Sequence, residues 1–268
     1  MTSFTRAEVL QRISAALEAG QKIFERFTPG EIAAEYKSGH DPVTEADRTV
    51  DVALRHELLR HGEGWLSEET LDDFTRLDKK HVWVVDPLDG TREFVAGIPE
   101  FCISVAFVED GVPVAGGICN PVTHETFLGS LDSGVLYNGQ PVHVSQRTEL
   151  TGAVILASRS ETKRGEWHQF DRAPFTVRPT GSVAYKLALV SAGLADGTFT
   201  LTPKHEWDVA AGAALVASGG GFVQTLERTP LRCNSRSLKI SGLIACGARL
   251  SESLVAQVLA GRQHPSVR

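Results

Sequence analysis

The chain has 268 residues, of which 42% are hydrophobic and 22% are charged, and its formal net charge at pH 7 is −6. This length and composition are ordinary for a globular protein with a substantial core. The negative net charge argues against a protein that binds nucleic-acid polymers or anionic membranes through a global positive field.

The N-terminal segment, residues 1–6, lacks a basic region followed by an apolar core, so we expect no signal peptide. No run of about 18 apolar residues occurs, which argues against a transmembrane helix. The cysteines lack C-x-x-C spacing and are expected to be buried free thiols: Cys102, Cys119, Cys233 and Cys246. Together these observations predict a cytoplasmic protein that associates with no membrane.

Two amphipathic helices are expected near the N-terminus. Residues 5–27 carry apolar residues at three- and four-residue steps, as one buried helix face requires. After a loop around Pro42, Thr44 and Asp47 match the capping box that opens a helix. The buried face of this second helix should contain Val50, Leu54 and Leu58. Locally, Asp47 needs no role beyond that of a helix cap.

The next two segments are apolar strands that end in acids. The first, residues 64–67, is followed by Glu68 and Glu69, which by themselves are typical of a solvated loop. The second, residues 82–85, leads into a sharp turn in which Asp86 and Asp89 stand three positions apart. Either the turn is only a solvated, capped connection, or its carboxylates bind a hard cation for phosphoryl chemistry.

The second interpretation would use Gly90 and Thr91, although the turn by itself favours a purely structural role and only the rest of the chain reverses this. Gly90 lacks a Cβ, so the backbone can approach a ligand closely. If a helical turn begins at Thr91, the free N–H groups of both residues form a cradle for an anion.

The rest of the chain predicts two different halves. Strands at 101–108, 112–118 and 126–128, with a hairpin around Asn138-Gly139, predict a mainly antiparallel sheet. Beyond residue 150, short strands alternate with helices, which favours an α/β arrangement. We therefore expect an N-terminal α+β domain over residues 1–148 and a C-terminal α/β domain over residues 149–268.

Four ordered segments together resemble the inositol monophosphatase superfamily of metal-dependent, lithium-sensitive phosphatases. Residues 83–91 (WVVDPLDGT) match the first family signature, and residues 206–212 (EWDVAAG) match the second. The segments at 67–69 (SEE) and 41–47 (DPVTEAD) fall in the expected order, so the resemblance covers nearly the whole chain. It implies a layered αβαβα sandwich, with the active site of a phosphoric monoester hydrolase between the two halves.

The resemblance also implies which residues bind metal. Glu68, Asp86 and the backbone carbonyl of Leu88 would hold a first Mg²⁺, and Asp86, Asp89 and Asp208 a second, with a third, looser ion near Glu68. Li⁺ would inhibit at the second position, and Ca²⁺ or Mn²⁺ can substitute in crystals. The implied homodimer has no interface that the sequence identifies.

The remaining implied roles are catalytic or substrate-binding. Thr91 would hydrogen-bond the attacking water and Asp47 would orient or deprotonate it, with Glu68 as the third catalytic residue. A functional role for Asp47 is therefore favoured over a cap alone. The residues that would contact the substrate are Gly90, Thr91, Ser158, Gly181, Ser182 and Glu206. Gly181 and Ser182 could equally be a helix cap, and Lys37, Lys186 and Lys204 could be either site residues or solvated lysines.

The substrate is a small phosphorylated metabolite whose identity the motifs address only in part. Three segments resemble the 3′(2′),5′-bisphosphate nucleotidases: residues 92–94, 158–160 and 206–208, although Glu161 replaces their histidine. Leu201 stands where inositol enzymes commonly carry a glutamate. Residues 94–99, however, are closer to the inositol and archaeal sugar-phosphate branches. The leading hypothesis is 3′-phosphoadenosine 5′-phosphate, and the alternatives are an inositol-1-monophosphatase, a sugar (bis)phosphatase, or a non-catalytic member that binds a metabolite or a protein.

Overall fold

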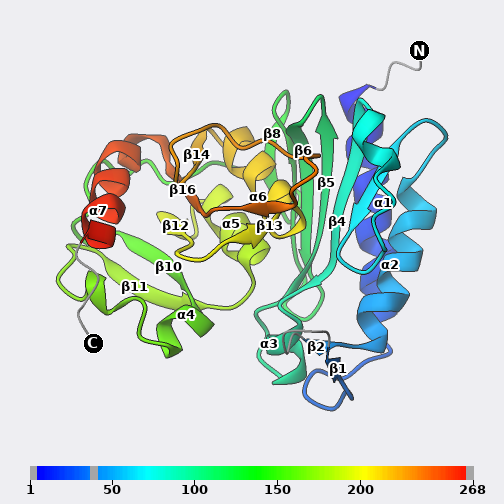
Figure 1. Ribbon diagram of the computed structural model, residues 1–268, viewed down its shortest axis with the longest axis horizontal. Helices are drawn as coiled ribbons and strands as arrows, with labels where there is room; N and C mark the ends of the chain where they lie inside the picture. Colours follow the sequence, from blue (N-terminus) through cyan, green and yellow to red (C-terminus); the bar gives the residue numbers. More distant parts are fainter. Residues whose placement is uncertain (1–4, 37–41, 264–268) are drawn as a thin grey trace.

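The computed structural model describes residues 5–36 and 42–263, which form a sandwich of alternating helical and sheet layers (Figure 1). Helices α1 (Arg6–Phe24) and α2 (Glu45–Leu58) cover one face of a large sheet. Helices α5 (Val183–Ser191) and α6 (Glu206–Ser218) separate that sheet from a second one, and α7 (Ser251–Gln263) lies on the outer side. The expected αβαβα sandwich is confirmed.

Within the described residues, the large sheet has seven strands in the order β3-β4-β5-β6-β7-β8-β9. The pair β3–β4 is parallel and every other neighbouring pair is antiparallel, which confirms the expected mainly antiparallel sheet. The strands are β3 (Gly64–Ser67), β4 (His81–Asp89), β5 (Cys102–Glu109), β6 (Val112–Asn120), β7 (Glu125–Ser130), β8 (Gly134–Tyr137) and β9 (Gln140–Val142).

Strand β4 is a nearly continuous apolar run because both of its faces are buried. Trp83 and Val85 pack with α1 and α2, whereas Val82 and Val84 belong to the core that contains α5 and α6. Successive side chains of a strand point to opposite faces, so a strand between two helical layers has no position left for polar residues. The carboxylates therefore come only at the end of the strand, at Asp86 and Asp89.

The second sheet, again within the described residues, has the order β11-β10-β12-β16-β14 and mixes parallel with antiparallel pairs. Its strands are β10 (Val154–Ser158), β11 (Thr176–Thr180), β12 (Gly197–Phe199), β14 (Gly221–Thr225) and β16 (Leu243–Gly247). Shorter elements complete the fold: β1 (Glu35–Tyr36), β2 (Pro42–Val43), α3 (Thr91–Val95), α4 (Arg159–Lys163), β13 (Lys204–His205) and β15 (Lys239–Ile240).

A shared core joins the two halves. One cluster of buried residues includes side chains from β4 and β5, from α5 and α6, and from β10 and β16. The expected boundary at 148/149 falls between β9 and β10. The two halves on either side of it pack on each other through the α5–α6 layer. The expected free cysteines are confirmed, and all of them are buried. Over the described residues, no helix combines the length and apolarity that crossing a membrane would require.

Gly212 permits close packing between α5 and α6, and its replacement tests this contact. A Cβ on Gly212 would lie 2.3 Å from the Leu187 Cβ of α5. We expect Gly212→Ala to lower the free energy of unfolding by about 1–3 kcal/mol, as overpacking does. In an unobstructed helix the same change would raise it by about 1 kcal/mol. Urea unfolding measures the sign, and a stabilised variant would contradict the packing described.

Candidate active site

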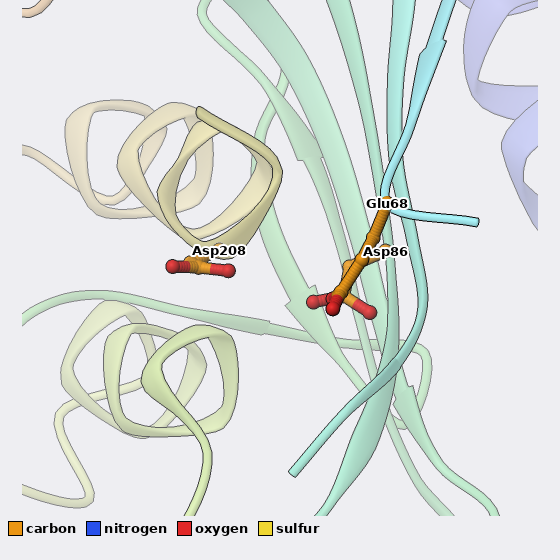
Figure 2. A group of neighbouring side chains, drawn as sticks. All are labelled: Glu68, Asp86 and Asp208. Carbon is orange, nitrogen blue, oxygen red and sulfur yellow. The ribbon is translucent and has the colours of Figure 1, made fainter. Parts of the chain in front are cut away.

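Three carboxylates from distant parts of the chain converge at one end of β4 (Figure 2). Glu68 directly follows β3, Asp86 lies in β4, and Asp208 lies in the first turn of α6. Their candidate ligand oxygens all lie within 4.8 Å of one another. Figure 2 shows Glu68 and Asp86 side by side, with Asp208 across from them at the end of its helix. Because β3 and β4 are parallel neighbours, residues at their carboxyl ends necessarily meet.

The electrostatics of this cluster favour a bound cation. Burial raises the pKa of Asp86 well above its ordinary value, and the charges of Glu68, Asp89 and Asp208 raise it further. Burial and the Asp89 charge raise the pKa of Asp208 in the same way. Like charges at this distance repel strongly where water is excluded. Carboxylate oxygens are the ligands that Mg²⁺ prefers, so the donor set fits a Mg²⁺ ion.

Asp89 lies beside the cluster but bonds to the N-terminus of α5. Its Oδ2 accepts hydrogen bonds from the Ser182 hydroxyl at 2.6 Å and from the Ala184 N–H at 2.5 Å. The pairing of β4 with β5 shifts register between Asp86 and Asp89, and this irregularity turns Asp89 toward the helix. Ser182 is the N-cap of α5, so its expected capping role is real and coincides with a contact to Asp89.

Asp47 is both a helix cap and a neighbour of Thr91. One carboxylate oxygen accepts hydrogen bonds from the Thr44 N–H at 2.7 Å and the Thr44 hydroxyl at 2.6 Å. The other accepts from the Thr91 hydroxyl at 3.0 Å, which also lies 3.0 Å from the Leu88 carbonyl oxygen. Burial raises the pKa of Asp47. The two interpretations of this residue from the sequence are therefore compatible.

Gly90 occupies a position that no larger residue fits. It precedes α3 with φ of 99°, in the left-handed region, and an added Cβ would lie 3.0 Å from the Glu100 carbonyl oxygen. The short helix α3 begins at Thr91, which meets the condition set for an anion cradle. The backbone at Gly90 and Thr91 therefore has the turn geometry that an anion cradle requires.

A pocket of about 390 Å³ adjoins the acidic cluster. Residues from both halves line it, including these predicted ones: Glu68, Leu88, Asp89, Gly90, Thr91, Ser158, Gly181, Ser182, Lys186, Lys204 and Asp208. Asp47 and Asp86 lie behind this lining, in contact with it through Thr91 and Leu88. The structure thus brings nearly all the predicted site residues to one cavity.

Glu206 is the exception, because its carboxylate bonds to residues outside the pocket lining. Its buried carboxylate accepts hydrogen bonds from the Asn234 N–H at 2.6 Å and from the N–H and hydroxyl of Ser235 at 2.9 and 2.8 Å. Glu206 precedes Asp208 by two positions, which on a helix turns a side chain about 200° away. It therefore faces away from the pocket.

The pocket lysines are not solvated, which corrects one of the two interpretations. Lys186 is 2% exposed, and its Nζ donates to the Ser182 carbonyl at 2.6 Å and the Thr180 carbonyl at 3.3 Å. The Lys204 side chain is 16% exposed and lies near the buried Glu161. Their partners are distant in the sequence or are backbone atoms, so no local pattern revealed this burial. Lys37 lies outside the described residues.

Asp51 supports the loop that carries Glu68, and the sequence analysis missed it. Its two oxygens accept hydrogen bonds from the Ser67 hydroxyl at 2.5 Å and the Thr70 hydroxyl at 2.7 Å, one on each side of Glu68-Glu69. Asp51 stands one helical turn after Asp47 on α2. That spacing was the available signal, since residues at i and i+4 share a helix face.

Comparisons with known proteins agree with this geometry. The model of the inositol monophosphatase family matches residues 5–263. An inositol-1-monophosphatase of Mesorhizobium japonicum is 35% identical, over 80% of this chain and 84% of its own length. A fructose-1,6-bisphosphatase/inositol-1-monophosphatase of Thermotoga maritima is 33% identical, over 78% and 82%. The structure of the extragenic suppressor protein suhB of Bartonella henselae superposes with a TM-score of 0.80 at 30% identity, over 94% and 98%.

Thr70→Val tests whether the Asp51 contacts position the metal loop. The change removes one of two hydroxyl donors at nearly constant volume, so Glu68 should be less well fixed. We expect the affinity for Mg²⁺ to fall roughly tenfold, the lower end of the effect of groups that orient ligands. Calorimetric titration of the purified protein measures it. The matched control is Thr49→Val on α2, whose hydroxyl bonds only the Glu45 carbonyl of its own helix in the contacts described. Equal affinities in both variants would contradict the role of Asp51.

Proposed function

Because this chain belongs to the inositol monophosphatase family and is a phosphoric monoester hydrolase, we propose that it removes one phosphate from a doubly phosphorylated nucleotide. The first candidate is 3′-phosphoadenosine 5′-phosphate, which would make the chain a member of the 3′(2′),5′-bisphosphate nucleotidase-like branch. This proposal rests on the separation of charge within the pocket. Acidic side chains lie at the end of β4, and basic side chains line another part of the same pocket.

The cationic part of the wall comes from the C-terminal half. Arg159, Arg164, Lys186 and Lys204 all line the pocket together with the hydroxyl groups of Ser158, Ser160 and Thr202. Three of these cations pair with carboxylates, namely Arg159 with Glu100, Arg164 with Glu166 and Lys204 with Glu161, and a single phosphate bound at the acidic cluster would bring no ligand anion to this part of the wall. A second phosphate on the same substrate can accept charge-assisted hydrogen bonds from them. This arrangement supports a bisphosphate over a monophosphate.

The residues that would hold Mg²⁺ are Glu68, Asp86, Asp89, Asp208 and the carbonyl of Leu88. When bound, Mg²⁺ supplies Lewis-acid polarisation of the phosphate and activation of water. The chain contributes the rest: the Thr91 hydroxyl hydrogen-bonds the attacking water, and Asp47 orients it or accepts its proton. The backbone at Gly90 and Thr91 positions the phosphate oxygens. No covalent phosphoenzyme is part of this proposal.

Further details of the proposal concern ions and assembly. We propose two to three Mg²⁺ ions, since the carboxylates from three segments offer more oxygens than one ion uses. Inhibition by Li⁺, replacement by Ca²⁺ or Mn²⁺ and assembly as a homodimer stay predictions from the family resemblance.

The names of relatives favour a second candidate, an inositol phosphate or a sugar bisphosphate. The Mesorhizobium relative is named for inositol 1-phosphate and the Thermotoga relative for both substrates. Against inositol, Leu201 packs against the buried core cluster of the second sheet instead of offering a carboxylate to hydroxyl groups. A non-catalytic binding protein is the weakest alternative, because every carboxylate of the site is present.

The substrate proposal is tested by phosphate release in Mg²⁺. We expect the ratio kcat/KM to be at least about 100-fold higher for 3′-phosphoadenosine 5′-phosphate than for inositol 1-phosphate, since a desolvated charged contact contributes about 1.5–3 kcal/mol and each 1.4 kcal/mol is tenfold. Fructose 1,6-bisphosphate serves as the third substrate. A preference for either alternative would replace the nucleotide while leaving the phosphatase assignment intact.

Asp89→Asn tests the metal ligands. The amide oxygen can still accept from Ser182 and Ala184, so the fold should persist while one ligand charge is lost. We expect kcat to fall more than about 100-fold, because transition-state charge stabilisation at such sites is worth several kcal/mol. The control is Asp171→Asn, whose side chain is 70% exposed. Wild-type turnover by Asp89→Asn would contradict the assignment.

A further inference from the structure

A buried carboxylate lies behind the cationic part of the pocket. Glu161, in the first turn of α4, is 0% exposed. Its Oε2 accepts a hydrogen bond from Trp167 Nε1 at 3.1 Å, and its Oε1 accepts from the Thr202 hydroxyl at 2.8 Å. Lys204 Nζ lies 3.5 Å from the same Oε1 and 3.0 Å from the Thr202 hydroxyl. Glu161 therefore cannot touch a ligand, whereas two of its partners line the pocket.

Stability alone does not account for this arrangement. Trp167, which bonds to Glu161, stacks on Phe199 with ring centroids 4.3 Å apart, so the acid adjoins an aromatic core. Burying an ion pair in such surroundings is often no better than burying apolar residues of the same volume. One visible consequence of the pair is that the Lys204 ammonium lies beside Glu161 while Lys204 lines the pocket.

The surroundings of Glu161 favour its charged form. Burial acts to raise the pKa of Glu161, but the Lys204 charge and the hydrogen bonds from Thr202 and Trp167 lower it below its ordinary value. Burial lowers the pKa of Lys186 to about 8; the charge of Asp89 opposes this shift, whereas the charge of Lys204 adds to it. The two ammonium groups thus repel each other. An anion bound between them would relieve that repulsion.

We propose that Lys186 and Lys204 form a second anion site in the pocket, for a phosphate that is not hydrolysed, with Glu161 as the residue that positions Lys204. Ser158 and Ser160 line the same pocket, whereas the Thr202 hydroxyl donates its proton to Glu161. Glu161 interacts with both ammonium groups and holds Lys204 in place without contacting the ligand. This inference rests on the proposed function, because it explains how the enzyme selects a bisphosphate.

The experiment compares two substrates that differ by one phosphate. 3′-Phosphoadenosine 5′-phosphate and adenosine 3′-phosphate present the same scissile bond, but only the first can occupy the second site. We expect Lys204→Met to reduce the preference for the bisphosphate by about 10- to 100-fold, the effect of one charge-assisted contact. Glu161→Gln, which keeps the shape but releases Lys204, should reduce it by roughly tenfold, mainly through KM. Lys163→Met removes an exposed lysine of α4 outside the pocket lining and is the matched control.

The outcomes separate this inference from the substrate proposal. A selective loss of the bisphosphate preference in Lys204→Met and in Glu161→Gln would support the second anion site. Equal losses for both substrates, or no change, would overturn it, because a structural role affects both reactions alike. If the wild-type enzyme prefers sugar phosphates, the nucleotide proposal fails, and the inference is judged on fructose 1,6-bisphosphate against fructose 1-phosphate in the same variants. A wild-type enzyme that does not discriminate within either pair would also overturn it.

Discussion

The repulsion between buried carboxylates is the constraint around which this fold is arranged. Asp86 is 2% exposed and faces the charges of Glu68, Asp89 and Asp208. The fold offsets part of this repulsion with helix N-termini, whose free N–H groups and dipoles favour negative charge. Asp89 accepts from the Ala184 N–H in the first turn of α5, and Asp208 accepts from the His205 N–H at the start of α6. Asp47 does the same at α2.

A site divided between two halves also requires a rigid connection between them. The α5–α6 layer supplies most of it, since it packs against both sheets. A polar contact adds to it: Arg76, 0% exposed, donates to the Asn234 side chain at 2.8 Å and the Ser235 carbonyl at 2.9 Å. The same two residues donate their N–H groups to Glu206. Through these two residues, Glu206 connects the first turn of α6 to Arg76, in the segment after Glu68. This connection also helps to fix the position of Asp208, which lies in the same turn of α6.

Short-range sequence patterns predicted the elements whose structure depends on residues close by in the chain. The apolar run of β4, the capping box of Thr44 and the Asn138-Gly139 hairpin all depend on neighbours a few residues apart, so the sequence alone was sufficient. Strand β11 was missed because Pro179 and exposed side chains are typical of a loop, although an edge strand accepts both. The burial of Lys186 and the direction of Glu206 depend on contacts 4 to 29 residues away. The metal carboxylates came from matching family motifs, not from periodicity.

The pocket shows why a net charge of −6 is compatible with an anionic substrate. Exposed charges are largely screened beyond about 8–10 Å in physiological salt, so a ligand in the pocket responds mainly to the groups that line it. The acids at the β4 end repel a phosphate unless a divalent cation offsets them, whereas Lys186 and Lys204 attract one directly. Under the proposed bisphosphate specificity, one phosphate would meet the metal and the other the lysines. The arrangement of charge in the pocket, more than its sum, would then determine which anion is held and which of its phosphates meets the catalytic groups.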